Sequence, residues 1–373
     1  MATEDPRRAT NPLFNDRKLK LGTFCSNLSG GCTISSMDGM LEADWAQTSE
    51  LARLADEMEF EAIVPVGRWK GFGGVTDFNG AGFECFTFAA GMGAQTRHPS
   101  VFATSHVPAI HPVLAAKQAT TVDHISGGRF TLNVVTGWHK SEIEIFGAQM
   151  LEHDERYRCA AEWLEIILRL WTEDDPVTHE GKYYQVKAAM HRPFPLQRPR
   201  PALMSAGSST AGRNFAAKYC DVGFTTLDAH DADSMRARVD MYRNLARDEY
   251  GREMQVWTSA YIFQAETEVE ARRLYHHCVH EKGDWAAADN LIATMGLHSQ
   301  GIPPDALERL KEHFIAGWAG YPLIGTASMV VDGLQALSDA GFDGVVLSWA
   351  PYVAGMRQFK TETLPLVVQA GLR

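Results

Sequence analysis

The run Gly344-Val345-Val346-Leu347-Ser348-Trp349 contains successive apolar residues, not the alternation of apolar and polar residues found in half-exposed strands. Ala202-Leu203-Met204 has the same character. Strands of this kind are buried on both faces, as in a parallel barrel, where helices cover one face and the packed interior covers the other. Both runs therefore predict parallel strands of an α/β fold.

Similar short runs recur along the chain, and helix-forming stretches with apolar residues at three- and four-residue spacing separate them. Eight strands are predicted, over residues 21–25, 62–66, 101–105, 130–135, 202–205, 222–226, 257–263 and 344–349. Helices are predicted over residues 45–58, 113–125, 155–171, 211–218, 233–248 and 328–340. Eightfold alternation is typical of a (β/α)₈ TIM barrel. No G-x-G-x-x-G turn follows the first strand, which disfavours a doubly wound sheet.

We expect one barrel domain over residues 1–373, because TIM barrels often reach this length. Two stretches do not fit the strand-helix repeat and are interpreted as insertions. The first, near 173–201, is rich in proline and has a strand signal at 182–186. The second, near 281–321, lies between the last two predicted strands and carries its own helical pattern.

The charge balance limits the possible partners. The chain has 35 Lys and Arg against 46 Asp and Glu, a formal charge of -11, which disfavours binding to nucleic acid or to anionic membranes. No apolar stretch is long enough to span a bilayer, and the N-terminal residues include no apolar run. Six cysteines occur without a C-x-x-C pair, so no zinc ribbon is expected. We therefore expect a cytoplasmic protein with reduced cysteines.

Polar residues follow several predicted strands, where a TIM barrel places its active site. The second strand leads into Gly67-Arg68 and a glycine-rich loop, which could bind an anion or be a solvent loop. The third ends in Thr104-Ser105-His106, where a lone histidine is more often structural. Asn133 lies among apolar residues of the fourth strand. Burying its amide unpaired costs roughly 1 to 3 kcal/mol, so we expect a partner in the barrel or a bound ring.

Ser208 and Ser209 lie in the run that joins the fifth strand to the next helix. Free N–H groups and hydroxyls at the N-terminus of a helix can bind a phosphate group. An ordinary serine N-cap is the simpler explanation of the same residues.

Four motifs in order resemble the bacterial-luciferase-like flavin monooxygenases, and among them the pyrimidine oxygenase and dimethyl-sulfone monooxygenase group. The motifs are Gly71-Phe72-Gly73-Gly74, the stretch 125–138 (Ile-Ser-Gly-Gly-Arg-Phe and, further on, Asn-Val-Val-Thr-Gly-Trp), the stretch 151–158 (Leu-Glu-His-Asp-Glu-Arg-Tyr-Arg) and Leu323-Ile324-Gly325-Thr326. The resemblance runs from about residue 21 to the C-terminus and is weak over 280–315.

The resemblance implies a set of site residues. Residues that match FMN-binding positions are Gly67, Arg68, Asn133, Glu142, Arg156, Tyr157 and Ser209, with Ser208 as the neighbouring alternative. Those that match the surroundings of flavin N5, where dioxygen reacts in the pyrimidine oxygenase, are Thr104, Asn133 and Trp138. The family usually has Met where this chain has Val66, so the oxygen pocket is expected to differ in shape. It has a bulkier residue where this chain has Gly67, so the contact of Gly67 is expected through its backbone.

The implied activity is that of a two-component monooxygenase, which receives reduced FMN from a separate NAD(P)H-dependent reductase and uses dioxygen, at N5, to oxygenate a small organic substrate. A heteroaromatic ring, a sulfone and a halogenated compound remain open as substrates, and the aromatic residues near the strand ends favour a planar one. The family implies a homodimer or homotetramer.

Three alternatives remain. The same superfamily includes deazaflavin-dependent hydride-transfer enzymes, although the stretch from Asn133 to Trp138 favours an oxygenase. A metal-dependent barrel hydrolase would need a metal on residues such as His276 and His280, which share a helical face but lie away from the strand ends. We predict no metal site. A binding barrel without catalysis is also conceivable, since a fold does not dictate an activity.

Overall fold

The computed structural model describes residues 5–296 and 303–373, and within them eight parallel strands close into a barrel. Each strand pairs with the next, and the eighth pairs with the first. In barrel order they are β1 (Lys20–Phe24), β2 (Ala62–Val64), β3 (Ser100–His106), β4 (Phe130–Val135), β7 (Ala202–Ser205), β8 (Val222–Phe224), β9 (Gln255–Gln264) and β11 (Gly344–Trp349). All eight predicted strands, and with them the TIM barrel, are confirmed.

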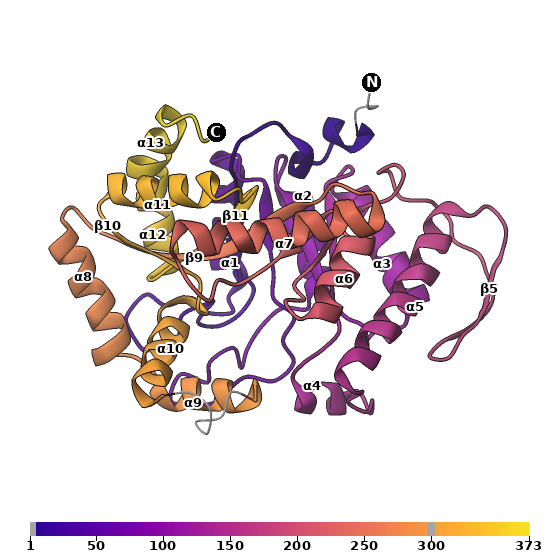
Figure 1. Cartoon of the computed structure of the whole chain (residues 1–373), viewed down its shortest axis with the longest axis horizontal. Coiled ribbons are helices and arrows are strands. Elements are labelled where there is room, and N and C mark those ends of the chain that lie inside the picture. The colour runs from indigo at the N-terminus through magenta and orange to yellow at the C-terminus, as the bar shows by residue number, and fades with distance from the viewer. Residues whose placement is uncertain (1–4, 297–302) are drawn as a thin grey trace.

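Helices surround the barrel (Figure 1). The six predicted ones are confirmed as α1 (Trp45–Glu57), α3 (Pro112–Ile125), α5 (His153–Thr172), α6 (Thr210–Tyr219), α7 (Ala232–Tyr250) and α11 (Ala327–Asp339). Others were not predicted: α2 (Cys85–Gln95), α4 (Lys140–Ile145), α12 (Tyr352–Gln358) and α13 (Leu364–Gln369). The prediction missed α2 because its sequence, CFTFAAGMGAQ, is apolar or small on almost every side and shows no amphipathic period.

The N-terminal segment fills the end of the barrel where the strands begin. Leu13 is fully buried in the apolar cluster of the barrel interior, together with Phe102 and Trp257. Asn11 donates a hydrogen bond to the carbonyl of Phe130 at the start of β4, and Gln255 at the start of β9 donates one to the carbonyl of Leu13. These contacts close the barrel at the end where its strands begin.

The first predicted insertion forms an antiparallel hairpin of β5 (Val177–Glu180) and β6 (Gln185–Ala189). The predicted strand at 182–186 is wrong in its bounds. The strand begins only at Gln185, because Lys182, Tyr183 and Tyr184 form the turn. The carboxylate of Glu162 on α5 accepts hydrogen bonds from the backbone N–H groups of these three residues. That carboxylate therefore fixes the turn to α5.

The second predicted insertion contributes α9 (Trp285–Thr294) and α10 (Pro304–Gly317), and residues 297–302 of it lie outside the described part. It follows α8 (Glu268–His276) and a π-helical turn (His277–Glu281), and ends in β10 (Tyr321–Gly325), an unpredicted strand parallel to the end of β9. Side chains of α9 and α10, including Leu291 and Ile315, pack against Ile34, Phe72 and Phe78 from the loops after β1 and β2. We call this apolar cluster the cap core.

Candidate active site

Thr104 and Asn133 lie side by side on neighbouring barrel strands, in register between β3 and β4. The hydroxyl of Thr104 donates to the carbonyl of Pro65 at 2.6 Å and accepts from Asn133 Nδ2 at 3.1 Å. Asn133 is 6% exposed, and its Oδ1 has no hydrogen-bond partner among the described residues. A buried acceptor of this kind is costly unless a bound molecule supplies a donor.

Glu142, on α4, binds the loop that follows β2. Its Oε2 accepts from Arg68 Nη1 at 3.0 Å, while its Oε1 accepts from the backbone N–H groups of Trp69 at 2.6 Å and Lys70 at 3.1 Å. Burial alone would raise the pKa of Glu142, but the nearby imidazole of His139, whose Nδ1 lies 3.4 Å from Oε2, and the charge of Arg68 outweigh it and lower the pKa to about 2. The carboxylate therefore holds loop and guanidinium in place.

Replacing Glu142 by glutamine is expected to lower the melting temperature by a few degrees at neutral pH, because the new amide donor would face Arg68 or the N–H groups of the loop. A depressed carboxyl pKa stabilises the fold above its ordinary value of 4.5 and ceases to do so as the pH falls toward 2. Thermal unfolding of both proteins between pH 7 and pH 3 checks this. A melting-temperature gap that stays constant below pH 4.5 would contradict the ion-pair explanation.

Three aromatic side chains surround the guanidinium of Arg68, and we call Phe72, Trp138 and Trp318 the aromatic box. The carbon of the guanidinium lies 4.8 Å from the ring centre of Phe72, 5.4 Å from that of Trp138 and 5.8 Å from that of Trp318. Phe72 and Trp138 are nearly parallel to each other, at 10°. The box joins the loops after β2 and β4 to the end of α10.

Two helix N-termini meet near Tyr157. Ser209 caps α6, where its Oγ accepts from the backbone N–H of Gly212 at 3.1 Å, so the N-cap explanation of this serine is correct. A Cβ atom added at Gly207 or at Gly212 would lie 2.7 or 2.6 Å from the Tyr157 hydroxyl, which places that hydroxyl against the loop before α6. The Ser209 hydroxyl can still donate its own proton to a ligand. Ser208 is exposed, and its carbonyl accepts from Arg213.

Arg156 precedes Tyr157 on α5 and donates from Nη1 to the carbonyl of Gly137, after β4. Its Nε is buried and has no partner among the described residues. Arg156 also lines a cavity of about 350 Å³ between Thr136 and the hairpin residues Tyr183 and Tyr184. This volume lies within the usual range for small-molecule sites.

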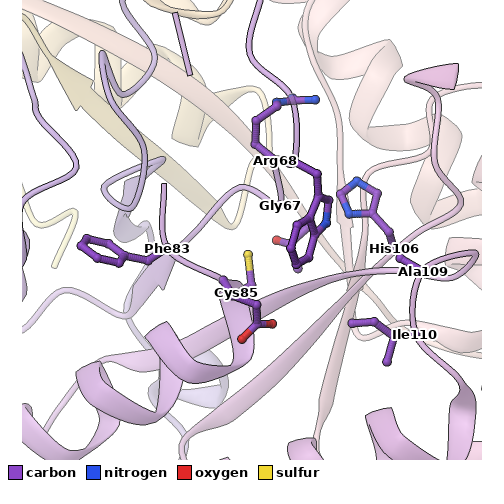
Figure 2. Close-up of a pocket in the computed structure, with 10 residues that line it drawn as sticks. Gly67, Arg68, Phe83, Cys85, His106, Ala109 and Ile110 are labelled. Atoms are coloured by element: carbon purple, nitrogen blue, oxygen red, sulfur yellow. The ribbon is translucent and has the colours of Figure 1, made fainter. Parts of the chain in front are cut away.

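A much smaller cavity lies between the ends of β2 and β3. It is lined by Gly67, Arg68, Trp69, Phe83, Glu84, Cys85, Thr104, His106, Ala109 and Ile110, and its free volume of about 10 Å³ holds roughly one small molecule such as water. Figure 2 shows His106 beside Gly67, while the side chain of Arg68 extends away from Cys85 and Ile110. Cys85 belongs to the unpredicted α2, so no sequence pattern indicated its place beside this cavity.

Gly67 and His106 depend on each other sterically. A Cβ atom at Gly67 would lie 2.7 Å from Cε1 of His106, so a larger residue would displace the imidazole. Burial lowers the pKa of His106 to about 4, and the charge of Arg68 acts in the same direction. The ring is therefore neutral near pH 7. This contact gives a physical reason for glycine at position 67 of this chain.

The histidines considered for a metal lie elsewhere. The rings of His276 and His280 are 4.9 Å apart, on α8 and the turn after it, and His276 and His277 pair with Glu281. In the part of the chain that the structure describes, no group of three or more histidine, cysteine or carboxylate side chains could hold a metal ion. Within the same residues, no helix has both the length and the apolar character needed to cross a bilayer.

Comparison with known proteins places the chain in a family. Residues 19–344 match the family model of the luciferase-like monooxygenases. The chain belongs to the luciferase-like monooxygenase family. The resemblance inferred from the four motifs is thereby confirmed, as is the assignment as a flavin-dependent monooxygenase.

Two curated relatives of this luciferase-like chain cover it almost completely. The FMNH(2)-dependent dimethylsulfone monooxygenase of Pseudomonas putida is 29% identical over 355 residues, 94% of this chain and 95% of its own length. The pyrimidine monooxygenase RutA of Bradyrhizobium sp. (strain BTAi1 / ATCC BAA-1182) is 25% identical over 370 residues, 95% of this chain and 99% of its own length. The crystal structure of long-chain alkane monooxygenase (LadA) superposes with a TM-score of 0.81 at 21% identity over 96% of this chain and 92% of that one, and shows the shared fold.

Proposed function

We propose that this chain is the oxygenase component of a two-component monooxygenase that uses FMNH₂ and dioxygen. The observation that carries the proposal is the pair of unpartnered polar atoms at the barrel mouth, Asn133 Oδ1 and Arg156 Nε. An acceptor and a cationic donor are what the polar ring edge and the phosphate of FMN would satisfy. The FMNH(2) dependence of the dimethylsulfone monooxygenase of Pseudomonas putida supports the same cofactor.

The residues divide into two binding regions. Arg156, Tyr157 and Ser209 would hold the phosphate by charge and by hydroxyl donors, aided by the free N–H groups at the start of α6, with Ser208 as the exposed neighbour of that site. Asn133 would meet the ring edge at N5 through its free Oδ1.

The second region lies around N5. Thr104, whose hydroxyl accepts from Asn133, would orient that amide, and Gly67 and Arg68 would contact the ring through their backbone. Glu142 would act by positioning this loop. Trp138 would shield the ring from water.

When bound, reduced FMN would supply the electrons that activate dioxygen, and the protein would supply orientation and a dry site. The small cavity beside Thr104 is about the size of one water molecule, and we place the approach of dioxygen to N5 on this side of the site. The chain would need an NAD(P)H-dependent flavin reductase as partner, and we expect a homodimer or homotetramer. The aromatic box favours a planar or partly aromatic substrate, such as a heteroaromatic ring, a sulfone or a halogenated compound.

The proposal is tested by supplying FMNH₂ from an unrelated reductase together with ¹⁸O₂ and a panel of these substrates. We expect tight FMNH₂ binding and one labelled oxygen atom in the product. A parallel assay with reduced deazaflavin and no oxygen tests the hydride-transfer alternative, for which the fold is equally suitable. Substrate reduction in that assay, with neither FMN binding nor label in the first, would overturn the proposal.

A further inference from the structure

Arg68 leaves one edge of its guanidinium unused. Its Nη1 binds Glu142, but across residues 5–296 and 303–373 neither Nε nor Nη2 has a hydrogen-bond partner. The side chain is only 2% exposed, and of the two free nitrogens Nε is fully buried, so water cannot readily satisfy Nε, whereas Nη2 keeps some access from outside. Nε and Nη2 together form the side fork of arginine, with two parallel donors at the spacing of two neighbouring oxygen atoms. Leaving the buried Nε of this charged fork unpaired is costly unless a ligand that reaches the fork through Nη2 completes it.

Glu142 does not need this edge. Its two oxygens already accept from Trp69 N, Lys70 N and Arg68 Nη1, and His139 Nδ1 lies 3.4 Å from Oε2. The carboxylate therefore anchors the guanidinium at one corner and leaves the fork free. The result is a donor pair with a fixed position.

The aromatic box restricts the same group. The guanidinium carbon lies within 4.8 to 5.8 Å of the ring centres of Phe72, Trp138 and Trp318, so these rings hold the guanidinium by cation–π contact without using its N–H donors. Trp318 and Ala319 both have positive φ, 54° and 53°, a left-handed conformation that is unfavourable for residues other than glycine. Such local strain persists where surrounding packing enforces it, often at ligand sites. Here it brings Trp318, at the end of α10, to the guanidinium.

The surroundings place the fork next to the cap core, away from the proposed phosphate site. Phe72 belongs to the cap core and Trp318 packs against it, so the guanidinium faces the insertion. The proposed phosphate site, by contrast, lies between α5 and the start of α6. A flavin contact at Gly67 and Arg68 requires only the backbone, which leaves the Arg68 side chain for a second ligand.

We propose that the Nε–Nη2 edge of Arg68 binds a substrate group that presents two neighbouring oxygen acceptors, a carboxylate or a sulfonyl group, while the aromatic box packs against the adjoining apolar part. This inference rests on the proposed function, because it assigns the fork to the molecule oxygenated beside the flavin. A guanidinium fork matches two oxygens far better than one, and a lysine cannot reproduce it. Arg68 would therefore determine specificity.

The test uses three aryl probes on the FMN-loaded protein: methyl phenyl sulfone, benzoate and methyl phenyl sulfide, which has the same apolar part as the sulfone but no oxygen. Calorimetric titration should show the sulfone or benzoate binding about 10- to 100-fold more tightly than the sulfide. In Arg68→Gln and in Arg68→Lys, which keeps the charge without the fork, this preference should disappear. The exposed neighbour Lys70→Gln is the matched control and should retain it.

Each contrary outcome is distinguishable. Equal affinity of the wild-type protein for sulfone, benzoate and sulfide, or no binding of any of them, overturns the inference even if the Arg68 variants fail to fold. A preference that survives in folded Arg68→Gln also overturns it. A loss of FMN affinity in Arg68→Lys would assign the fork to the flavin and overturn it as well. Failure of the wild-type protein to bind FMN at all would instead overturn the proposed function.

Discussion

Replacing Arg156 and Ser209 together by alanine is expected to raise the Kd for FMN by at least about 100-fold. Each substitution removes a donor to the proposed phosphate position, and hydrogen bonds to charged groups contribute roughly 1.5 to 3 kcal/mol each. Arg156 is suited to the role because its Nε is buried and unpartnered, and Ser209 because it begins α6. Quenching of FMN fluorescence on titration with protein measures the effect.

Two controls make this result specific to the phosphate. Riboflavin, which has the ring but no phosphate, should bind the wild-type protein and the double variant about equally. Arg158→Ala removes a nearby exposed arginine that pairs with Glu155, and it should leave FMN binding unchanged. Unaltered FMN affinity in the double variant would show that the phosphate binds elsewhere.

The second large effect is expected at Asn133 and Thr104. Asn133→Ala should lower the rate of substrate oxygenation about 100-fold, as expected for loss of a preorganised polar group at the reacting atom. Thr104→Val should act in the same direction, because it removes the hydroxyl that accepts from Asn133 Nδ2. The rate at which labelled product forms at saturating FMNH₂ is the measurement. FMN affinity should change much less than the oxygenation rate.

Thr131→Val is the matched control for Thr104→Val. Thr131 is also a buried threonine of the barrel, on β4, but its hydroxyl pairs with Ser100, at the start of β3. Its replacement should leave oxygenation intact. Equal losses in the two valine variants would mean that both act through the stability of the barrel, and the assignment of Thr104 to the N5 region would then be wrong.

Sequence patterns were sufficient for the barrel because each strand carries its own local signal. Residues 202–205 and 344–349 were predicted to the residue, since continuous apolar runs bounded by turns are informative by themselves. Segments without a contrast between apolar and polar positions were missed. Helix α2 is apolar on nearly all sides, and β10 is short and begins with Tyr321-Pro322, so neither had a periodic signal.

For the site, the sequence identified residues but not most of their partners. The family resemblance pointed to Arg68 and Glu142 separately, yet their ion pair joins positions 74 residues apart and appears only in the fold. The same holds for Gly67 against His106, and for the contact of Trp318 with Arg68. Asn133 is the exception, because a lone amide in an apolar strand already implied a missing partner.

Closure of the barrel at the end where its strands begin affects the order in which molecules bind. Leu13 and its neighbours fill the interior at that end. Anything as large as a flavin therefore has to enter and leave at the opposite rim, where the strands end and where α9 and α10 pack against the loops. With a single entrance, a substrate bound at Arg68 beside the aromatic box would obstruct the exit of a cofactor bound deeper in the barrel mouth. Turnover should therefore be sequential, with the nucleotide first in and last out, and its exchange would limit how fast a reductase can sustain the cycle.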